Sequence, residues 1–256
     1  MAKVALVCAV LNAFEEFTEL VASAKTKNNE LKFYVQLQNR HQIPLSKAWN
    51  NGIREAIADG CEYIIVSNDD VLFAPFTIDE MVRQASSVLA NYKLEADALN
   101  RRGVPHTDKE PVLFAPLDVG ETFDDPLEII FSKKSTEFKF REQELFSCFM
   151  ITPRTVELVG TFDENFDPAW HEDNDYAVRT QALLGLGVVK FKIPYIHRGS
   201  SSTKKLLRPL NSRKGQEYYI KKWGSYTRDA EKGELFRTPY NRQDLTPRDW
   251  IPNYRG

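Results

Sequence analysis

Hydrophobic and polar positions repeat with two different periods along the first ninety residues. Residues 4–11 are continuously apolar, which is typical of a strand buried on both faces of a parallel sheet. Residues 31–37 alternate between apolar and polar side chains, and this period of two also predicts a strand. The continuous runs and the period of two predict strands over 4–11, 31–37 and 63–66. Apolar residues at the helical period of about 3.6 predict helices over 14–25, 46–59 and 78–90. This alternating order indicates an α/β fold with a mostly parallel central sheet flanked by helices.

The pattern becomes less regular beyond residue 90. Residues 91–144 combine four prolines with many charges, so we expect loops around one or two strands there. Farther along, the pattern predicts strands over 146–151 and 188–193, a short helix over 153–159 and a longer helix over about 172–184. No internal repeat or low-complexity segment is visible, which favours one domain followed by a C-terminal tail.

The composition is that of a folded protein, but its charge is unevenly distributed. Because 42% of the 256 residues are hydrophobic, a disordered chain is excluded, and no apolar run is long enough to predict a spanning helix. Residues 1–196 hold 20 Lys and Arg against 30 Asp and Glu, whereas residues 197–256 hold 14 against 6. The net charge of −2 is therefore the sum of −10 and +8. Such a basic segment indicates an anionic partner; a solvated tail, or one that docks on the acidic body, is the alternative.

The cysteines and the N-terminus bear on the compartment. Cys8, Cys61 and Cys148 lie far apart in apolar stretches and do not form the pattern of a disulfide framework. We therefore expect a reducing, cytoplasmic location, with peripheral attachment to a membrane left open. A signal-peptide core is the alternative interpretation of residues 4–11. Only Lys3 precedes this run as a basic residue, and no small-x-small cleavage site follows it, so a strand is favoured.

The first cluster of candidate chemistry follows a predicted strand. Residues 63–66 lead directly into Ser67-Asn68-Asp69-Asp70. The carboxyl ends of parallel strands are where α/β sheets bind ligands, and carboxylates there suit Mg²⁺ or Mn²⁺ shared with a diphosphate. A plain turn is the alternative, because Asn and Asp favour turns. Neither a Gly-x-Gly-x-x-Gly motif nor a P-loop is present, which argues against the usual dinucleotide and nucleoside-triphosphate sites.

The second cluster opens the predicted helix over 172–184. Its sequence is WHEDNDY, residues 170–176. Acidic residues complement the dipole at a helix N-terminus, but this explains only one or two of the three. A carboxylate in this position is expected to keep its charged form and can therefore act as a general base. His197 directly follows the last predicted strand, and a structural role is the alternative for this histidine.

Taken together, these segments resemble family-2-type glycosyltransferases of the GT-A fold. The segments that carry the resemblance are KAWNNGIREA (47–56), YIIVSNDD (63–70), VGTFDENF (159–166), HEDNDY (171–176) with Arg179, and HRGSSS (197–202). They cover roughly residues 3–202 in the order that the family shows. The resemblance implies a Rossmann-like GT-A domain over 1–202, with a nucleotide-sugar-binding half over 1–90 and an acceptor half over 91–202. Residues 203–256 would form a basic extension packed on or near the active site.

The resemblance also implies an activity. The chain would be an inverting transferase that uses Mn²⁺ or Mg²⁺ and moves a sugar from a nucleotide-sugar, with a UDP-sugar favoured, to a hydroxyl of a glycan or glycoconjugate. Asp70 and His197 would bind the metal, and Asp173 would be the general base, with Glu172 beside it. Contacts to the donor are assigned to Val10, Asn12, Asn51, Asn68 and Asp69, and contacts to the acceptor to Trp170, His171 and Asp175. From position and charge alone, Lys204 and Arg208 are further candidates for the donor diphosphate.

Two residues depart from the family pattern. Asn68 occupies the first position of the Asp-x-Asp motif, so one potential metal ligand is a neutral amide. Trp49 stands where many relatives carry Arg or Lys, which removes an expected phosphate contact.

Other functions are weighed against this one. A sugar-phosphate nucleotidyltransferase would need a Gly-rich basic loop after the first strand, and residues 12–15 do not form one. The other alternative is a module that binds nucleic acid or an anionic glycan through interleaved aromatic and basic residues of the tail. The residues concerned are Tyr218, Tyr219, Lys221, Lys222, Trp223, Tyr226, Arg228, Tyr240, Arg242 and Trp250. Packing of these aromatics onto the body is the simpler explanation, so nucleic acid is the less favoured partner; homo-oligomerisation stays open.

Overall fold

The computed structural model describes residues 1–11, 14–37, 43–102, 110–119, 147–184, 187–199 and 212–223. Its strands are β1 (Lys3–Val10), β2 (Glu30–Leu37), β3 (Tyr63–Asn68), β4 (Val71–Phe73), β5 (Leu113–Asp118), β6 (Cys148–Ile151) and β7 (Val189–His197). Its helices are α1 (Phe14–Ser23), α2 (Leu45–Ala58), α3 (Thr77–Arg101), α5 (Pro153–Val159), α6 (Glu172–Leu184) and α8 (Ser212–Trp223). The strands and helices predicted from the sequence are all present, most of them within a few residues of their predicted bounds.

The strands form one mixed sheet in the order β2-β1-β3-β6-β5-β7-β4. β1 is parallel to β2 and β3, and β5 is parallel to β7. β6 is antiparallel to both β3 and β5, so β1, β2, β3, β5 and β7 run in one direction. β4 runs against this direction beside β7. The predicted α/β fold with a mostly parallel sheet is confirmed. Two strands are antiparallel to the others: β6, which the hydrophobic pattern predicted without its direction, and β4, which the pattern did not predict.

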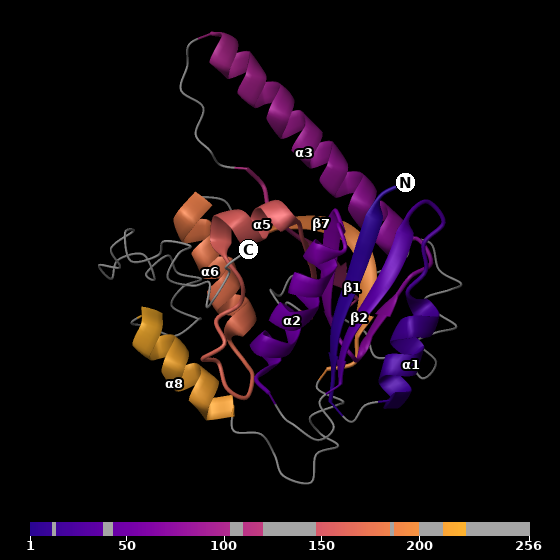
Figure 1. Cartoon of the computed structure of the whole chain (residues 1–256), viewed down its shortest axis with the longest axis vertical. Helices are drawn as coiled ribbons and strands as arrows, with labels where there is room; N and C mark the ends of the chain where they lie inside the picture. Colours follow the sequence, from indigo (N-terminus) through magenta and orange to yellow (C-terminus); the bar gives the residue numbers. More distant parts are fainter. Residues whose placement is uncertain are drawn as a thin grey trace.

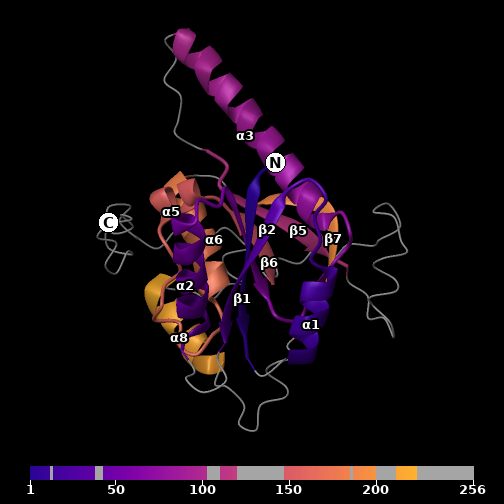
Figure 2. The same ribbon diagram turned by 45° about the vertical axis from the view of Figure 1, so that its right-hand side comes forward.

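Helices cover both faces of the sheet (Figures 1 and 2). One apolar core joins α2, α5 and α6 to one face, and a second core joins α1 and α3 to the other. β1 lies between these layers, and every residue from Val4 to Val10 is at most 7% exposed, which explains its continuous apolar run. α2 lies close to β1: a Cβ atom on Gly52 would be 2.6 Å from Val7 Cγ1, so only glycine fits this crossing.

Local signals explain several element ends. α5 begins with Pro153, and the side chain of Thr152 accepts a hydrogen bond from the Thr155 N–H at 3.3 Å. α3 continues to Arg101, well past the predicted end at residue 90. Its buried residues all lie between Thr77 and Ala85, and the rest of the helix projects from the body (Figures 1 and 2). The apolar pattern therefore reported only the packed part of this helix.

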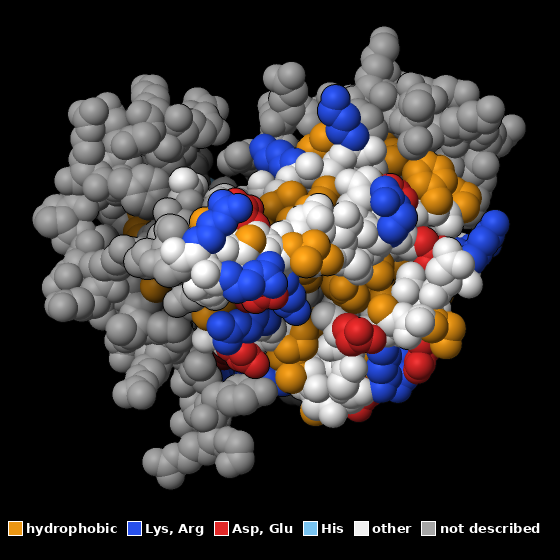
Figure 3. Space-filling model, turned by 90° about the horizontal axis from the view of Figure 1, so that it is seen from above, with side chains coloured by type: hydrophobic (Ala, Val, Ile, Leu, Met, Phe, Trp, Pro, Cys, Tyr) orange, Lys and Arg blue, Asp and Glu red, His pale blue; other side chains and the backbone are white. Residues whose placement is uncertain are grey.

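The described surface shows no large patch of one kind on the face seen from above. There, hydrophobic, basic and acidic side chains are interspersed (Figure 3). Within the described ranges, no helix has both the length and the hydropathy required to cross a bilayer. Cys8, Cys61 and Cys148 are buried free thiols.

Candidate active site

The ends of four strands gather the first group of candidate residues. Val10, Asn68, Asp118 and His197 are the last residues of β1, β3, β5 and β7. Because these four strands run in the same direction, their last residues lie along one edge of the sheet. Residues that are far apart in the sequence are thus collected at the edge where α/β sheets bind ligands.

Asp70 and His197, the two predicted metal ligands, are in contact. Asp70 Oδ1 lies 3.2 Å from His197 Nε2. The contact follows from the sheet, since the antiparallel register of β4 and β7 pairs Val71 with His197 and brings the preceding residue alongside. The backbone also links the two segments, because the Arg198 N–H donates to the Asp70 carbonyl oxygen at 3.1 Å. Asp70 is buried, so this pair is part of the fold and not a loose surface contact.

Asp118 is a further carboxylate of this group that the sequence analysis missed. Its Oδ1 accepts a hydrogen bond from the His197 N–H at 3.1 Å, and its side chain is buried. It falls in the stretch 91–144 that was predicted as mainly loops. The signal that could have found it is the apolar run 112–117 that ends in an acidic residue, as the run over β3 ends in Asn68-Asp69-Asp70.

Asp69 ties the turn after β3 to the end of β1. Its Oδ2 accepts a hydrogen bond from the Leu11 N–H at 3.1 Å, and the side chain is buried. Burial, together with the negative charges of Asp69 and Asp70, raises the pKa of the Cys8 thiol. Cys8 therefore stays protonated at neutral pH and serves as a core residue under the site.

The other predicted donor contacts are divided between two places. Val10 is buried at the end of β1, and the Asn68 N–H donates to the Ser147 carbonyl oxygen at 2.9 Å, so both belong to the sheet edge. Asn51 lies on α2, where its Oδ1 accepts a hydrogen bond from Arg54 of the same helix. Asn12, Lys204 and Arg208 lie outside the described residues.

Asp70 and His197 fit a metal site that is shared with a ligand. No group of three or more His, Cys, Asp or Glu side chains in the described part of the chain is arranged to hold a metal ion. One carboxylate and one imidazole do not complete the coordination of Mg²⁺ or Mn²⁺, which usually keep waters and take ligands from substrate phosphates. The pair therefore suits an ion that arrives with a diphosphate, and it does not suit a resident structural metal.

α2 fixes the segment that leads to the second group of residues. Asn50 donates from Nδ2 to the Phe162 carbonyl oxygen at 2.8 Å and accepts at Oδ1 from the Phe162 N–H at 2.9 Å. The Leu45 N–H donates to the Pro168 carbonyl oxygen at 3.0 Å. Because α2 follows β2, its first residue lies toward the carboxyl edge of the sheet, and so does Pro168. Trp49, whose position departs from the family pattern, is a core residue with its ring 5.3 Å from that of Phe162.

Trp170 and His171 precede α6 in an unusual backbone conformation. Their φ angles are 75° and 71°, in the left-handed region that disfavours side chains with a Cβ atom. Both side chains are partly exposed. Strain of this kind persists where the surrounding structure enforces it and is common at binding sites. The two residues are thus held beside the first turn of α6.

Burial controls the acidity of the first two residues of α6. Burial raises the pKa of Asp173 to about 6, and the nearby charge of Asp175 adds to the increase. The Asn174 N–H, which donates to Asp173 Oδ1 at 2.7 Å, acts in the opposite direction. Burial and the charge of Asp173 raise the pKa of Glu172 well above its usual value. We expected the helix N-terminus to favour the charged forms, but desolvation outweighs that effect here.

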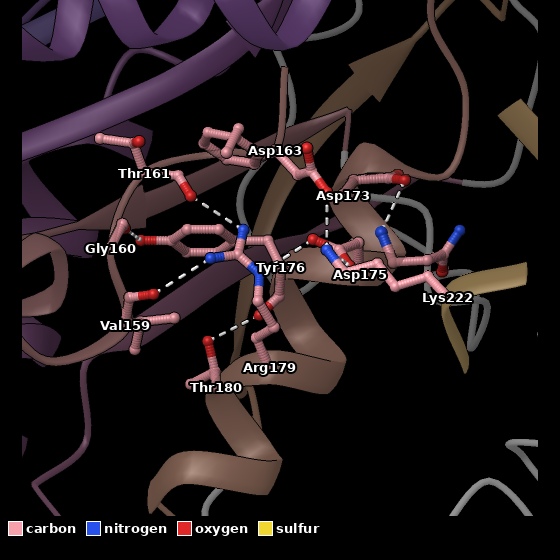
Figure 4. A network of polar contacts seen from close by, with 12 residues as sticks. Val159, Gly160, Thr161, Asp163, Asp173, Asp175, Tyr176, Arg179, Thr180 and Lys222 are labelled. Carbon is pink, nitrogen blue, oxygen red and sulfur yellow. Dashed lines mark hydrogen bonds and ion pairs between the residues drawn. The ribbon is translucent and has the colours of Figure 1, made fainter. Parts of the chain in front are cut away.

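Asp175 was expected to contact an acceptor, yet it lies inside the protein. It is fully buried, and its Oδ2 accepts from Arg179 Nε at 2.8 Å. Its Oδ1 lies 2.6 Å from Lys222 Nζ and accepts from Trp223 Nε1 at 2.9 Å (Figure 4). Both carboxylate oxygens are therefore engaged by side chains of the protein, because the i, i+4 spacing and α8 bring cations to them.

The described part of the C-terminal segment is a packed helix. Tyr219 and Trp223 of α8 are buried and form a small core with Phe166. Lys222 is also buried. These three residues were candidates for stacking on nucleic-acid bases or for binding phosphates, and their burial leaves them no face for such contacts. The residues of the same alternative beyond position 223 lie outside the described ranges.

Comparison with curated proteins gives one informative relative. No protein-family model matches the chain. A galactofuranosyl glycosyltransferase from Leishmania donovani is 26% identical over 168 residues, which are 57% of this chain and 39% of that protein. The chain thus spans about two fifths of the length of this relative.

Comparison with solved structures identifies the fold. The catalytic domain of Drosophila β1,4-galactosyltransferase 7 in complex with xylobiose matches with a TM-score of 0.51 and 14% identity, over 83% of this chain and 78% of that chain. A mutant of the Drosophila enzyme in complex with manganese, UDP-Gal and xylobiose matches with a TM-score of 0.50 and 13% identity over the same shares. The chain therefore has the GT-A fold of glycosyltransferases, as the sequence motifs implied.

Proposed function

We propose that this chain is a glycosyltransferase that moves a galactosyl group, in its furanose or pyranose form, from a UDP-sugar to a hydroxyl of a glycan or glycoconjugate. The contact between Asp70 and His197 at the carboxyl edge of a GT-A sheet carries this proposal. The similarity to a galactofuranosyl glycosyltransferase supports the sugar. The manganese and UDP-Gal of the related Drosophila complex support the donor and the metal.

The residues at the sheet edge would hold the donor. Asp70 and His197 are the proposed protein ligands of Mn²⁺ or Mg²⁺, and an ion held there would neutralise the charge that develops on the departing diphosphate. Asn68, with its neutral amide, adds no charge to this set, so the diphosphate itself must supply further ligands. Asp69, which the Leu11 N–H holds against the end of β1, and Val10 would lie beside the nucleoside.

The first turn of α6 would activate the acceptor. Asp173 accepts the proton of the acceptor hydroxyl as that oxygen forms its bond to the anomeric carbon. The bond from the anomeric carbon to the diphosphate breaks, and UDP leaves with the electron pair. A single displacement of this kind inverts the anomeric configuration, as in family-2-type enzymes. Trp170 and His171, held beside the base, are the proposed acceptor contacts.

The same chemistry distinguishes Asp173 from Glu172 as the base. With a pKa of about 6, Asp173 is about nine-tenths ionised at pH 7 and can accept a proton. Glu172 is buried, its pKa is raised well above the usual value, and its Oε2 has no hydrogen-bond partner among the described residues. A carboxyl group in that environment holds its proton at neutral pH and cannot take another from an acceptor.

Donor binding tests the proposal directly. Calorimetric titration of the chain with UDP-galactose and with its furanose isomer should show binding with Mn²⁺ that EDTA abolishes. Asp70→Ala should remove this metal-dependent binding, whereas Asp97→Asn, an exposed acidic position on the projecting part of α3, should not change it. GDP-, dTDP- and CDP-sugars form the comparison panel. Binding that is indifferent to EDTA and to Asp70→Ala would contradict the metal site, and a chain that transfers sugar from no donor would contradict the activity.

A further inference from the structure

α8 is fitted closely against the segment that carries the proposed acceptor contacts. A Cβ atom on Gly215 would lie 2.5 Å from the Trp170 carbonyl oxygen and 2.7 Å from that of Ala169. One turn farther along α8, the Tyr219 ring lies 5.5 Å from the His171 ring. Only glycine permits such an approach between a helix backbone and these carbonyl groups. The C-terminal helix is therefore seated specifically on the residues that precede Asp173.

Lys222 of α8 enters a buried ion cluster from this position. Its Nζ lies 2.6 Å from Asp175 Oδ1 and 2.8 Å from Asp163 Oδ2 (Figure 4). Asp163 belongs to the loop between α5 and α6, so one ammonium joins that loop to the first turn of α6. Arg179 binds the other oxygen of Asp175 and donates to the carbonyl oxygens of Val159 and Thr161 at 3.0 and 2.9 Å. A buried cluster of this kind fixes geometry because the loss of one partner leaves an uncompensated charge.

The charges around the first turn of α6 come from three elements. The titratable and charged groups that surround it are Asp163 and His171 from the loop, Glu172, Asp173, Asp175 and Arg179 from α6, and Tyr218, Tyr219 and Lys222 from α8. Two of these groups, Arg179 and Lys222, are cations in ion pairs, and Lys222 is the one that the C-terminal segment supplies. Burial lowers the pKa of Lys222, but the two carboxylates in contact favour its ammonium form.

We infer that Lys222 is a positioning residue for the reaction. Its ammonium holds Asp163 and Asp175 together and thereby fixes the first turn of α6, with Asp173, in the place where the base meets the acceptor. The role rests on the proposed function. It also makes α8 a component of the active site.

Removal of the ammonium should change the behaviour of the base in a characteristic way. Without Lys222, more of the negative charge of Asp175 acts on Asp173, and that charge already raises the pKa of Asp173. The acidic limb of the pH profile of kcat/KM should therefore move upward by about one pH unit. Loosening of the turn should lower kcat, whereas the donor site at the sheet edge keeps its own contacts.

The experiment compares four forms of the full chain with UDP-galactose and Mn²⁺. Lys222→Met should lower kcat at least about 30-fold, shift the acidic limb upward and leave donor affinity within about twofold. Lys222→Arg should restore most of kcat and the original limb. Lys221→Met, the same change at the neighbouring exposed residue, should behave like the wild type.

A second variant keeps the test valid if Lys222→Met does not fold. Asp163→Asn combined with Lys222→Gln removes one negative and one positive charge, so the net charge of the cluster is unchanged. Asp175 still loses its ammonium partner. The acidic limb of the kcat/KM profile should therefore shift upward in this variant too. A wild-type kcat and limb in either folded variant would overturn the role of Lys222 while the proposed function stands. A variant that loses both stability and kcat, but keeps the acidic limb of its kcat/KM profile at the wild-type pH, would overturn it as well. A wild-type chain without transferase activity would overturn the proposed function and this role together.

Discussion

The ionised carboxylate of Asp173 should lower the stability of the folded protein, although the same carboxylate is the proposed general base. Asp173→Asn should separate these two effects. The carboxyl group is ordinary in the unfolded chain, with a pKa of about 3.9, but burial raises its pKa to about 6 in the folded protein. The ionised form is thus disfavoured by folding. Below the unfolded pKa, the ionisation of Asp173 does not reduce the free energy of unfolding. As the pH rises from about 4 through 6, this ionisation progressively lowers the free energy of unfolding.

The size of this effect follows from the two pKa values. A difference of about two corresponds to an upper limit of about 3 kcal/mol at pH 7. Partial exposure of the side chain to water reduces the expected value to about 1–2 kcal/mol. An asparagine carries no charge at any of these pH values, so the variant should be more stable than the wild type by this amount at pH 7. At pH 5 the advantage should fall to about half.

Urea unfolding of both proteins at pH 5 and pH 7 measures this difference, and initial rates with a UDP-sugar measure the other half of the prediction. Asp173→Asn should slow transfer by about 10²-fold or more, because the amide cannot accept the proton. Donor affinity should stay near the wild-type value. Asp97→Asn, on the exposed part of α3, should change neither quantity. A variant that is less stable at pH 7, or one that keeps wild-type turnover, would refute the assignment of a base with a raised pKa to this position.

Three further changes test other contacts of the fold and the site. His197→Gln should weaken Mn²⁺-dependent donor binding at least about tenfold in calorimetry, since the amide is a poorer metal ligand; unchanged binding would contradict the pairing with Asp70. Asp118→Ala should lower the free energy of unfolding by about 1–2 kcal/mol because the part-buried His197 N–H loses its acceptor. Asp118→Asn retains an acceptor oxygen and should cost less, so equal losses would argue against the hydrogen bond as the cause. Gly52→Ala should cost about 1–3 kcal/mol in urea unfolding, since its Cβ would meet Val7 at 2.6 Å; a neutral result would show that α2 can shift from β1.

The sequence could predict the elements whose burial follows a regular period. The two-faced burial of β1 and the one-sided burial of α2 appear directly in the spacing of their apolar residues, and the bounds of α6 agree with the prediction. The antiparallel direction of β4 and β6 could not be predicted in the same way. β4 has three residues and β6 has four, and neither length records the direction of the neighbouring strand.

In the candidate site, too, some features could be predicted from the sequence and others could not. The contact between Asp70 and His197 was expected from the motifs, because both residues follow strands that run to one edge. The position of Asp175 could not be foreseen, because Lys222 and Trp223 lie on a helix that the pattern did not predict. The acidity of Asp173 was missed for a related reason. The helix dipole can be inferred from the sequence, whereas desolvation depends on the tertiary packing that surrounds the group.

The position of Lys222 also changes the meaning of the charge asymmetry. Residues 197–256 carry a balance of +8 against −10 for the body, which predicts either an anionic partner or a tail that is solvated or docks on the acidic body. Within the described part of that segment, Lys222 binds two carboxylates of the body itself, while Arg213, Lys214 and Lys221 stay exposed. Some of the asymmetry is therefore neutralised inside the protein. α8, which lies beyond residue 202, packs on the body through these ion pairs and through the core that Tyr219 and Trp223 form with Phe166. A chain truncated there would bury Asp163 without its ammonium partner and Asp175 with Arg179 alone, so truncation should destabilise the fold as well as the proposed active site.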